Sequence, residues 1–378
     1  MSTAARAPRV AIVTNMPSGY QSELFSALDQ RPECDIHVLF LRQMTPGRQW
    51  TRLPDTNYPH TFVRELRIHP YFYLNSGLFK ALRAARPDLI IVGQYAGIGM
   101  QLVMYYASMF GIPWVFWSER PGVEHTELPI FQSDWLRRFF RGIALFPVLR
   151  WPREIWGIGS RATAHYAENS RIPCRSVPYY SDLSRFLALQ RETQTGPLRF
   201  LCSGKLNIRK GVDLALTALR RLLKEEVDFR WTFMGDGPLR DEVVALATEH
   251  SDRVQYLGFK ELDEIPEVLR SHDVQVCASR YDGWGMVIPE GMAAGLAVLS
   301  TRGAGSALDL IQEDANGFLV EPGSADALYE GVSRMIAQPE RVTRFAKAGR
   351  QSVKAFHNVA GAEHFAACAV SAYQRGRG

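Results

Sequence analysis

Short apolar runs separated by helical patterns fill the first half of the chain. Four of these runs predict buried strands, and a helical pattern over Ser22–Leu28 follows the first of them. The strands are expected at Arg9–Thr14, Asp35–Leu41, Asp88–Val92 and Pro113–Trp117. Short β-branched runs that alternate with helices are typical of a parallel, doubly wound sheet, because helices then cover both faces of the strands.

The same alternation restarts near residue 198. An amphipathic helix is expected over Val212–Lys224, between the first two of five further strands. These strands are expected at Leu198–Ser203, Trp231–Met234, Val254–Leu257, Val274–Cys277 and Ala297–Ser300. The pattern therefore predicts an α/β fold of two Rossmann-like, doubly wound domains facing a cleft.

The domain boundaries follow from a polar segment and from the end of the pattern. The first domain is expected over residues 1–190 and the second over 198–356, with a linker at about 181–197 that ends in Thr-Gly-Pro. A helical tail lies in 357–378. It either closes the second domain or crosses back to the first.

Length and composition agree with two globular domains. A chain of 378 residues is long for one core, and 46% hydrophobic with 22% charged residues is ordinary for a globular protein. The 5 cysteines are scattered and form no CxxC pair. This favours reduced thiols over a disulfide framework or a zinc site. No apolar run reaches membrane-spanning length and the first residues lack a signal-peptide core, so a cytoplasmic location is expected.

The net charge of +5 is unevenly distributed. Residues 1–190 hold 21 Lys and Arg against 14 Asp and Glu, a balance of +7, and the remainder holds 23 against 25, a balance of −2. Arginines and large apolar residues mix over 136–153. This segment is either a membrane-interface segment at the inner face of a membrane or a surface helix packed on its own domain. If the segment lies in a membrane interface, a lipid-linked acceptor is expected.

The first loop with chemical character is SGKLNIRKG, residues 203–211. It follows a predicted strand and precedes a helix, and Lys205 and Lys210 bracket it closely enough to reach one diphosphate. The loop is not a P-loop, because GxxxxGK[ST] is absent. A solvated basic loop is the alternative. A second loop, FMGDGP at 233–238, also joins a strand to a helix, and by itself it is equally well explained as a plain turn.

The third segment, SRYDGWGMVIPEGM at 279–292, is the most informative. It places Asp282 in a glycine turn and Glu290 eight residues later in a predicted helix. Gly283 and Gly285 indicate positive φ or close approach of a ligand to the backbone. A helix start offers free N–H groups to an anion. The arrangement suits a ligand with phosphate in the middle and hydroxyls at both ends, such as a nucleotide sugar.

Together these motifs resemble the nucleotide-sugar glycosyltransferases of family 4, which are retaining enzymes with the GT-B fold, of the bacterial surface-polysaccharide or glycoconjugate type. The order GK…KG, GDGP, LGF, DGWGxxxxE, AAGLAV and NGFLV carries the resemblance between about residues 198 and 336. The resemblance implies that Lys205 and Lys210 hold the donor diphosphate. It also implies that Glu290 binds ribose hydroxyls and that Asp282 binds hydroxyls of the transferred sugar.

The remaining donor contacts are also implied by the resemblance. Backbone N–H groups of Gly285, Met286 and Val287 would face the sugar and phosphate, and the base would be read near Phe259 and Lys260. Gly204 and Gly235 would line the same edge of the second domain. Gly19, after the first strand, would approach the donor from the first domain, although a simple turn explains it too.

The chain departs from the family pattern in three ways. Asp282 stands where the family usually has Glu, and Lys205 stands where it usually has Arg, so a point charge replaces a bidentate fork. No His follows the strand that ends at Trp117. Glu119 is the first candidate for the polar role facing the donor sugar, and His125 is the second.

The expected activity is transfer of a sugar, with retention, from a nucleotide diphosphate-sugar to a hydroxyl of a saccharide, lipid-linked or small-molecule acceptor. A UDP-sugar is favoured over a GDP-sugar. No cofactor and no nucleic-acid partner are expected. No essential metal is expected either, because no Asp-x-Asp follows a strand. An epimerase of the same architecture and a binding protein that has lost catalysis stay as alternatives. A dinucleotide oxidoreductase is disfavoured, because GxGxxG is missing after the first strand.

Overall fold

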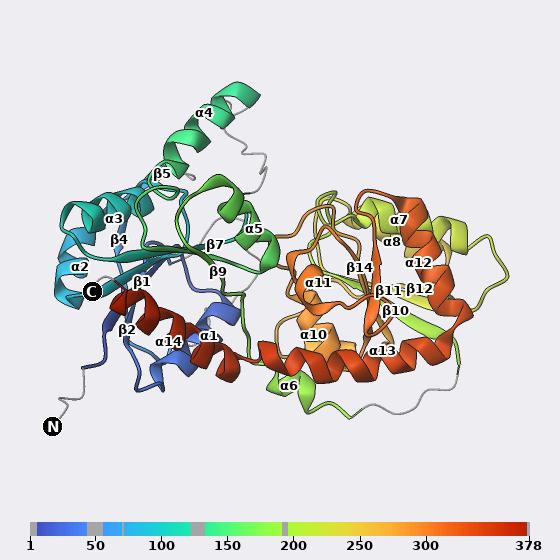
Figure 1. Cartoon of the computed structure of the whole chain (residues 1–378). Helices are drawn as coiled ribbons and strands as arrows, with labels where there is room; N and C mark the ends of the chain where they lie inside the picture. Colours follow the sequence, from blue (N-terminus) through green and yellow to red (C-terminus); the bar gives the residue numbers. More distant parts are fainter. Residues whose placement is uncertain (1–5, 44–55, 70–71, 122–132, 191–195, 376–378) are drawn as a thin grey trace. The chain divides into compact units, whose positions relative to one another are not determined.

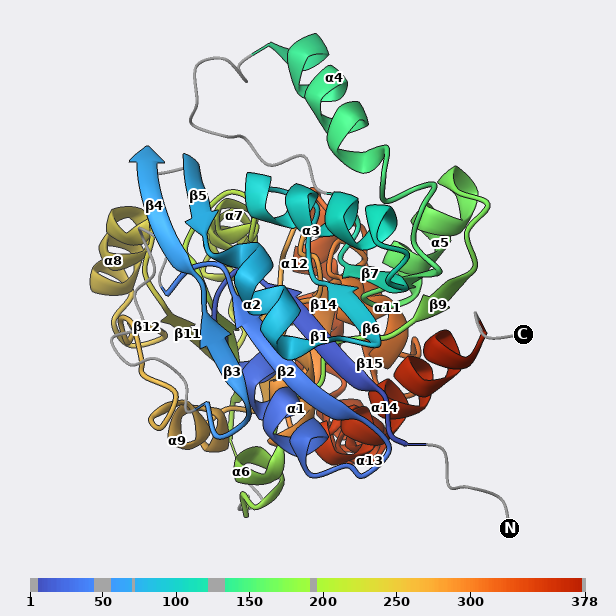
Figure 2. The ribbon, with the colours of Figure 1, turned by 90° about the vertical axis from the view of Figure 1, so that its left-hand side faces the viewer.

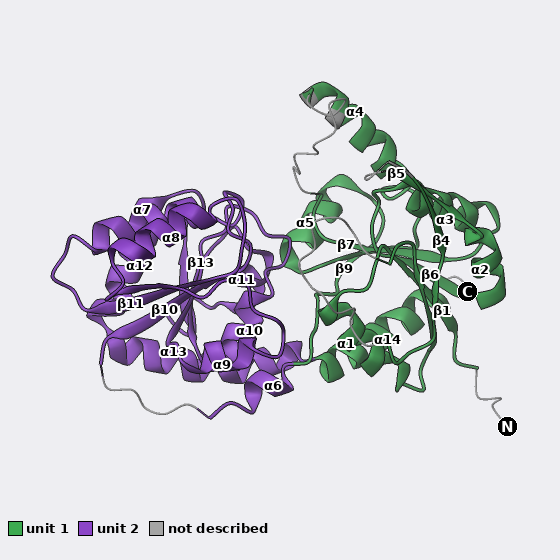
Figure 3. Cartoon of the chain, turned by 180° about the vertical axis from the view of Figure 1, so that it is seen from behind, with its two compact units in different colours: residues 1–182, 358–378 green, residues 183–357 purple. Residues whose placement is uncertain are grey.

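The computed structural model describes residues 6–43, 56–69, 72–121, 133–190 and 196–375. Within them the chain forms two compact units, each built on a parallel sheet (Figures 1 and 3). Unit 1 comprises Met1–Asp182 and Asn358–Gly378, and unit 2 comprises Leu183–His357. Two doubly wound units confirm the predicted α/β fold class.

The sheet of unit 1 has seven strands in the order β3-β2-β1-β6-β7-β8-β9, all parallel. Four of them match the predicted runs, while β3, β8 and β9 were not predicted. The bounds are β1 Arg9–Thr14, β2 Asp35–Phe40, β3 His60–Phe62, β6 Leu89–Val92, β7 Trp114–Ser118, β8 Glu154–Gly157 and β9 Cys174–Ser176. A separate antiparallel hairpin, β4 Arg64–His69 with β5 Phe72–Ser76, was not predicted either.

Helices cover both faces of this sheet. One core holds side chains from α2 Leu78–Ala85, α3 Ile98–Met109 and α5 Ser160–Asn169 together with the strands. On the other face, α1 Gly19–Asp29 packs beside α14 Asn358–Gln374 (Figure 2). Phe365 of α14 lies 5.1 Å from Trp117 and 5.2 Å from Trp156 between ring centroids. The last helix of the chain therefore belongs to the core of unit 1.

One helix of unit 1 differs from these. Helix α4, Asp134–Leu145, has no buried residue among those whose burial is described, and in Figures 1 and 2 it projects away from the sheet. Leu145, the last residue of this helix, packs against the core of unit 1. Both alternatives for residues 136–153, a membrane-interface segment and a packed surface helix, stay predictions. No helix within the described ranges is both long enough and apolar enough to cross a membrane.

Unit 2 has a six-stranded parallel sheet in the order β12-β11-β10-β13-β14-β15. Its strands are β10 Leu198–Ser203, β11 Phe229–Met234, β12 Val254–Tyr256, β13 Val274–Cys277, β14 Ala297–Thr301 and β15 Gly317–Val320. Its helices are α6 Ser184–Leu187, α7 Val212–Leu222, α8 Arg240–Glu249, α9 Ile265–Arg270, α10 Val287–Ala293, α11 Gly305–Leu310, α12 Ala325–Ala337 and α13 Pro339–Ser352, followed by a 3₁₀ turn at Val353–Phe356. The strand order changes direction between β10 and β13, and ligands of such sheets bind beyond the carboxyl ends at that point.

Candidate functional site

The loop after β10 is held against the loop after β11 by backbone contacts. The amide of Gly204 (φ +120°) donates to the Met234 carbonyl at 2.9 Å. A Cβ on Gly235 would lie 1.9 Å from the carbonyl oxygen of Gly204, so only glycine permits this approach. The amide of Leu206 donates to the Asp236 carbonyl at 2.9 Å. These contacts fix the backbone from which the exposed Lys205 extends.

The other end of the same loop is fixed against β13. Gly211 has φ +69°, and a Cβ on it would lie 1.9 Å from the carbonyl oxygen of Ala278. The side chain of Asn207 accepts a hydrogen bond from the Lys210 amide at 2.9 Å. Because the backbone is held on both sides, the side chain of Lys210 has a defined direction, toward the segment after β13.

Lys210 forms an ion pair with Asp282 across 72 positions of sequence. The lysine Nζ donates to Asp282 Oδ2, and the two side chains are only 21% and 12% exposed. Arg209 Nη1 lies 3.8 Å from the other carboxylate oxygen but is 46% exposed. The residue predicted to bind the donor phosphate, Lys210, is thus in direct contact with the residue predicted to bind the transferred sugar, Asp282.

The glycine turn around Asp282 is pinned by the segment after β14. The amide of Asp282 donates to the Gly303 carbonyl at 3.0 Å, and the amide of Gly305 donates to the Asp282 carbonyl at 3.1 Å. Gly285 has φ +94°, and its carbonyl accepts from Ser306 Oγ at 2.9 Å. The turn is therefore held at both ends in one conformation, as a preformed binding loop requires.

A second ion pair ties the same turn to α7. Arg280 Nη1 and Nη2 donate to the two carboxylate oxygens of Asp213 at 2.6 and 2.7 Å. This bidentate contact lowers the pKa of Asp213 below its ordinary value. Neither residue was predicted as part of the site. The available signal was position in the sequence. Arg280 stands two residues before Asp282, and Asp213 stands two residues after Gly211, which ends the loop of Lys205 and Lys210.

A small pocket lies where these loops meet, at the carboxyl ends of β10 and β13. Lys205 and Lys210 both line it, together with Gly204 and with Val287, the first residue of α10. Glu290 lies half-buried in the first turn of α10. The structure thus brings Lys205, Lys210, Gly204 and Val287 to one pocket, with Asp282 paired to Lys210 beside it. Gly285 and Met286 precede α10 directly.

The predicted base-reading residues lie after β12. Phe259 is half-buried, and Lys260 Nζ pairs with Glu264 Oε1 at 2.8 Å, so its ammonium group contacts its own turn. The amide of Gly235 donates to the Gly258 carbonyl at 2.8 Å. This bond connects the turn to the loop after β11, and through it to Gly204.

The predicted residues of unit 1 gather at the carboxyl ends of β1 and β7. Gly19 is buried at the start of α1, and the Tyr20 ring lies beside that of Tyr179, with ring centroids 4.6 Å apart and planes tilted by 51°. Burial raises the pKa of Tyr179 well above its ordinary value, and the neighbouring Tyr20 and Glu119 side chains raise it further. Tyr179 was not predicted as a site residue, because nothing local distinguishes it from a core aromatic.

The predicted roles of Gly19 and Glu119 toward a donor stay predictions. His125 lies outside the described residues. Within the described part of the chain, no group of three or more His, Cys, Asp or Glu side chains could hold a metal ion. The five cysteines all lie in the described ranges and are unpaired.

Comparison with known proteins places this site in a family. Residues 188–352 match the family model described as "Glycosyl transferases group 1". The 2-deoxystreptamine glucosyltransferase of Streptomyces kanamyceticus is 30% identical over 174 residues, 46% of this chain and 44% of that protein. The lipopolysaccharide core biosynthesis glycosyltransferase LpsE of Rhizobium meliloti is 28% identical over 324 residues, 82% of this chain and 83% of that protein. The chain spans less than half the length of the first curated relatives it matches.

Solved structures share the fold over almost the whole chain. Sucrose-phosphate synthase from Thermosynechococcus elongatus superposes with a TM-score of 0.71 at 19% identity, over 96% of this chain and 98% of that one. Anabaena HepE, solved in complex with UDP, superposes with a TM-score of 0.70 at 16% identity, over 96% of this chain and 100% of that one. The two parallel-sheet units are thus the GT-B architecture. Residues 188–352, which contain the lysine loop and the Asp282–Glu290 segment, form a domain of the group 1 glycosyl transferase family.

Proposed function

We propose that the protein is a retaining glycosyltransferase that moves a sugar from a nucleotide diphosphate-sugar to a hydroxyl group of an acceptor. The observation that carries the proposal is the meeting of two loops in the group 1 domain. Lys205 and Lys210 line one pocket, and Lys210 contacts Asp282. Cations at a pocket and a carboxylate beside it fit a ligand that joins a diphosphate to a polyhydroxyl group.

The lysines hold the diphosphate and stabilise its departure. As the bond between sugar and phosphate breaks, negative charge grows on the diphosphate, and fixed cations stabilise that charge without reorganising. Lys210 is already held in place by Asp282 and by the loop backbone. Binding of the donor exchanges the carboxylate for phosphate oxygens at Lys210. Asp282 is then available to accept hydrogen bonds from sugar hydroxyls.

The remaining contacts follow the family resemblance. Glu290 accepts hydrogen bonds from the ribose, and N–H groups of Gly285, Met286 and Val287 face the sugar and phosphate. The base lies near Phe259 and Lys260, which follow the edge strand β12. A UDP-sugar is favoured over a GDP-sugar, and the HepE structure in complex with UDP supports that preference. Asp282, one methylene shorter than the usual Glu, is the first candidate to set the choice of sugar.

No metal or cofactor is needed in this scheme, because the lysines take the role of the counter-charge. Retention of configuration follows the family, and the departing phosphate helps to deprotonate the acceptor hydroxyl. The acceptor is a saccharide or glycoconjugate. The relative from Rhizobium meliloti acts, by its name, in lipopolysaccharide core biosynthesis, which supports this class of acceptor.

A donor screen tests the proposal. Thermal unfolding is followed with UDP-, GDP- and ADP-sugars, because a ligand that binds only the native state raises the melting temperature by mass action. The donors that bind are then incubated with and without saccharide acceptors, and the products are analysed by mass spectrometry and NMR. Formation of a glycoside whose anomeric configuration is the same as that of the donor sugar supports the proposal. An epimerised donor without acceptor would instead identify an epimerase, and stabilisation by no nucleotide sugar would refute donor binding.

A further inference from the structure

Helix α4 has an apolar face and a basic face. Its apolar residues stand at 135, 136, 139, 140 and 143, and its arginines stand at 137, 138 and 141. With successive residues of a helix separated by about 100°, the first group covers one side and the arginines cover the opposite side. Such a helix in a globular protein normally buries the apolar side against the core.

The apolar side of α4 is instead exposed. Trp135 is 66% exposed, Phe139 56% and Ile143 52%, and α4 has no buried residue among those whose burial is described. Figures 1 and 2 show the helix extending beyond the body of unit 1. Contiguous exposed apolar area of this kind marks a surface for interaction rather than ordinary solvent contact.

Helix α3 continues the same surface. Ile98, Leu102, Tyr105 and Met109 follow one helical face at intervals of three or four residues and are 37–77% exposed. Gln101 Nε2 connects the two helices, because it donates to the carbonyl of Ala144 at 3.0 Å. Of the 17 exposed large hydrophobic residues in the described part of the chain, 11 fall between residues 98 and 151. The exposed apolar area is therefore concentrated in one region of unit 1.

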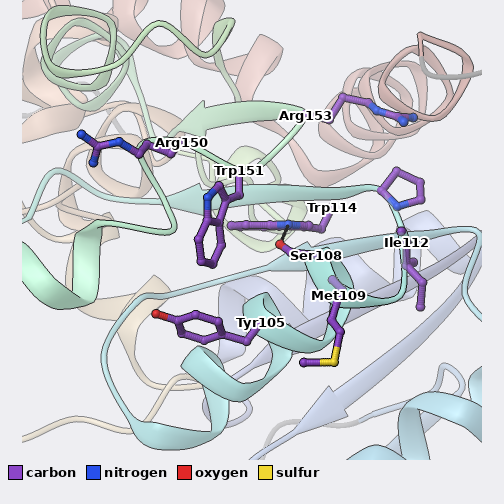
Figure 4. Close-up of a pocket in the computed structure, with 11 residues that line it drawn as sticks. Tyr105, Ser108, Met109, Ile112, Trp114, Arg150, Trp151 and Arg153 are labelled. Carbon is purple, nitrogen blue, oxygen red and sulfur yellow. Dashed lines mark hydrogen bonds between the residues drawn. The ribbon is translucent and has the colours of Figure 1, made fainter.

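An aromatic cluster joins α3 to the turn after α4. The Trp151 ring lies 5.1 Å from Tyr105 and 5.7 Å from Phe146, and the guanidinium of Arg150 lies 4.5 Å from the Phe146 ring centroid. A hollow of about 710 Å³ opens beside this cluster (Figure 4). Its lining combines aromatic rings with Met109 and two arginines. We call the exposed faces of α3 and α4 together with this cluster the α3–α4 surface.

The charge of the α3–α4 surface selects its partner. Residues 133–153 hold five arginines and one acidic residue, Asp134, and α3 holds no charged residue. A bilayer with anionic lipids matches this pattern, because rings and aliphatic side chains enter the boundary of the acyl region while arginines meet the phosphates. We propose that the α3–α4 surface docks unit 1 onto an anionic phospholipid bilayer. This binding does not depend on the donor chemistry of unit 2.

Vesicle flotation tests the proposal on the full-length protein. Vesicles of phosphatidylcholine alone are compared with vesicles that also contain phosphatidylglycerol, at low and high salt. We expect flotation with the anionic vesicles and release by salt, because surface charges are screened. The Arg138→Gln/Arg141→Gln variant should bind about 25-fold more weakly, at about fivefold per cation. The Trp135→Ser/Phe139→Ser/Ile143→Ser variant should lose roughly a hundredfold, because it removes the inserting side chains.

Matched variants on unit 2 serve as controls. Arg220→Gln/Arg230→Gln removes the same charge, and Val244→Ser removes an exposed apolar side chain of α8. Both should float like the wild type. Circular dichroism checks that every variant is folded. Flotation of the triple variant at the wild-type level, or absence of flotation with anionic vesicles, would overturn the proposal. So would light scattering that shows a dimer which only the triple variant dissociates, since the surface would then bind a second copy.

Discussion

Replacing Lys210 by methionine separates the stability of the site from its chemistry. The change keeps most of the side chain and removes the cation that pairs with Asp282. In the wild type the Asp282 side chain is 12% exposed, and its other neighbouring cation in the described residues, Arg209, lies 3.8 Å away and is 46% exposed. A nearly buried charge without its main partner is destabilising. We expect a loss of about 1.5–3 kcal/mol in the free energy of unfolding of unit 2, the range of a charge-assisted hydrogen bond.

This loss converts to a measurable shift. Unit 2 runs from Leu183 to His357. In domains of that size each kcal/mol moves the melting temperature by roughly 2–4 °C, so Lys210→Met should melt about 3–12 °C below the wild type. The double variant Lys210→Met/Asp282→Asn leaves no unpaired charge. It should recover most of that difference, because the two residues act as one pair.

UDP binding groups the variants differently from stability, because it depends on the lysine and not on the pair. Lys210→Met and the double variant should both lose the stabilisation that UDP gives, and turnover should fall by about 10²–10³, as on removal of one preorganised electrostatic contact. Asp282→Asn keeps the lysine and removes the anion that competes with phosphate, so UDP should bind at least as tightly as to the wild type. Calorimetric melting of the four proteins, with and without UDP, measures both effects. Wild-type UDP binding by Lys210→Met, or a double variant no more stable than the single one, would refute the reasoning.

Four further predictions follow, three on residues of unit 2 and one on metal dependence. Gly211→Ala should destabilise unit 2 by several kcal/mol, as seen by denaturant unfolding, because its Cβ would lie 1.9 Å from the carbonyl oxygen of Ala278 at φ +69°. The Asp213–Arg280 pair lowers the pKa of Asp213, so its stabilisation is present above the ordinary value of 3.8 and is lost as pH falls through the lower folded-state pKa. Asp213→Asn should remove that part of the acid dependence, and an unchanged acid-unfolding profile would contradict it. Glu290→Gln should weaken the binding of UDP about tenfold in titration calorimetry, and it should weaken the binding of 2′-deoxy-UDP less. Chelators should leave wild-type activity unchanged.

Five of the six strands of unit 2 were predicted, because each is a compact apolar run with turn residues at both ends, whereas β15 was not predicted. The approach of the loops that follow β10 and β13 was also predictable, since a parallel sheet brings the carboxyl ends of these strands together whatever the details of side-chain packing. Local sequence patterns could not predict contacts between side chains that are far apart in the sequence. The contact of Lys210 with Asp282 depends on the register of two strands and on the contact of Gly211 with Ala278.

Unit 1 was harder to predict for physical reasons. Strand β9 is three residues, Cys-Arg-Ser, none of them buried, so no hydrophobic pattern marks it. The hairpin of β4 and β5 carries exposed leucines at 66 and 74, which a pattern of buried and polar positions does not explain. The sequence left two alternatives open for α4, because an amphipathic sequence looks the same whether its apolar side meets a core or a bilayer.

The position of α14 has a consequence for synthesis. Unit 1 is interrupted at Asp182 and resumes at Asn358, whose amide donates to the Ser181 carbonyl at 2.9 Å. Phe365 of α14 fills the core beside Trp117, so the sheet of unit 1 lacks one covering helix until α14 emerges. At typical ribosome speeds the 175 residues of Leu183–His357, which precede α14, take about 10–35 s. During that time the nascent first unit exposes an apolar face, while unit 2, which is contiguous, can fold as soon as it emerges.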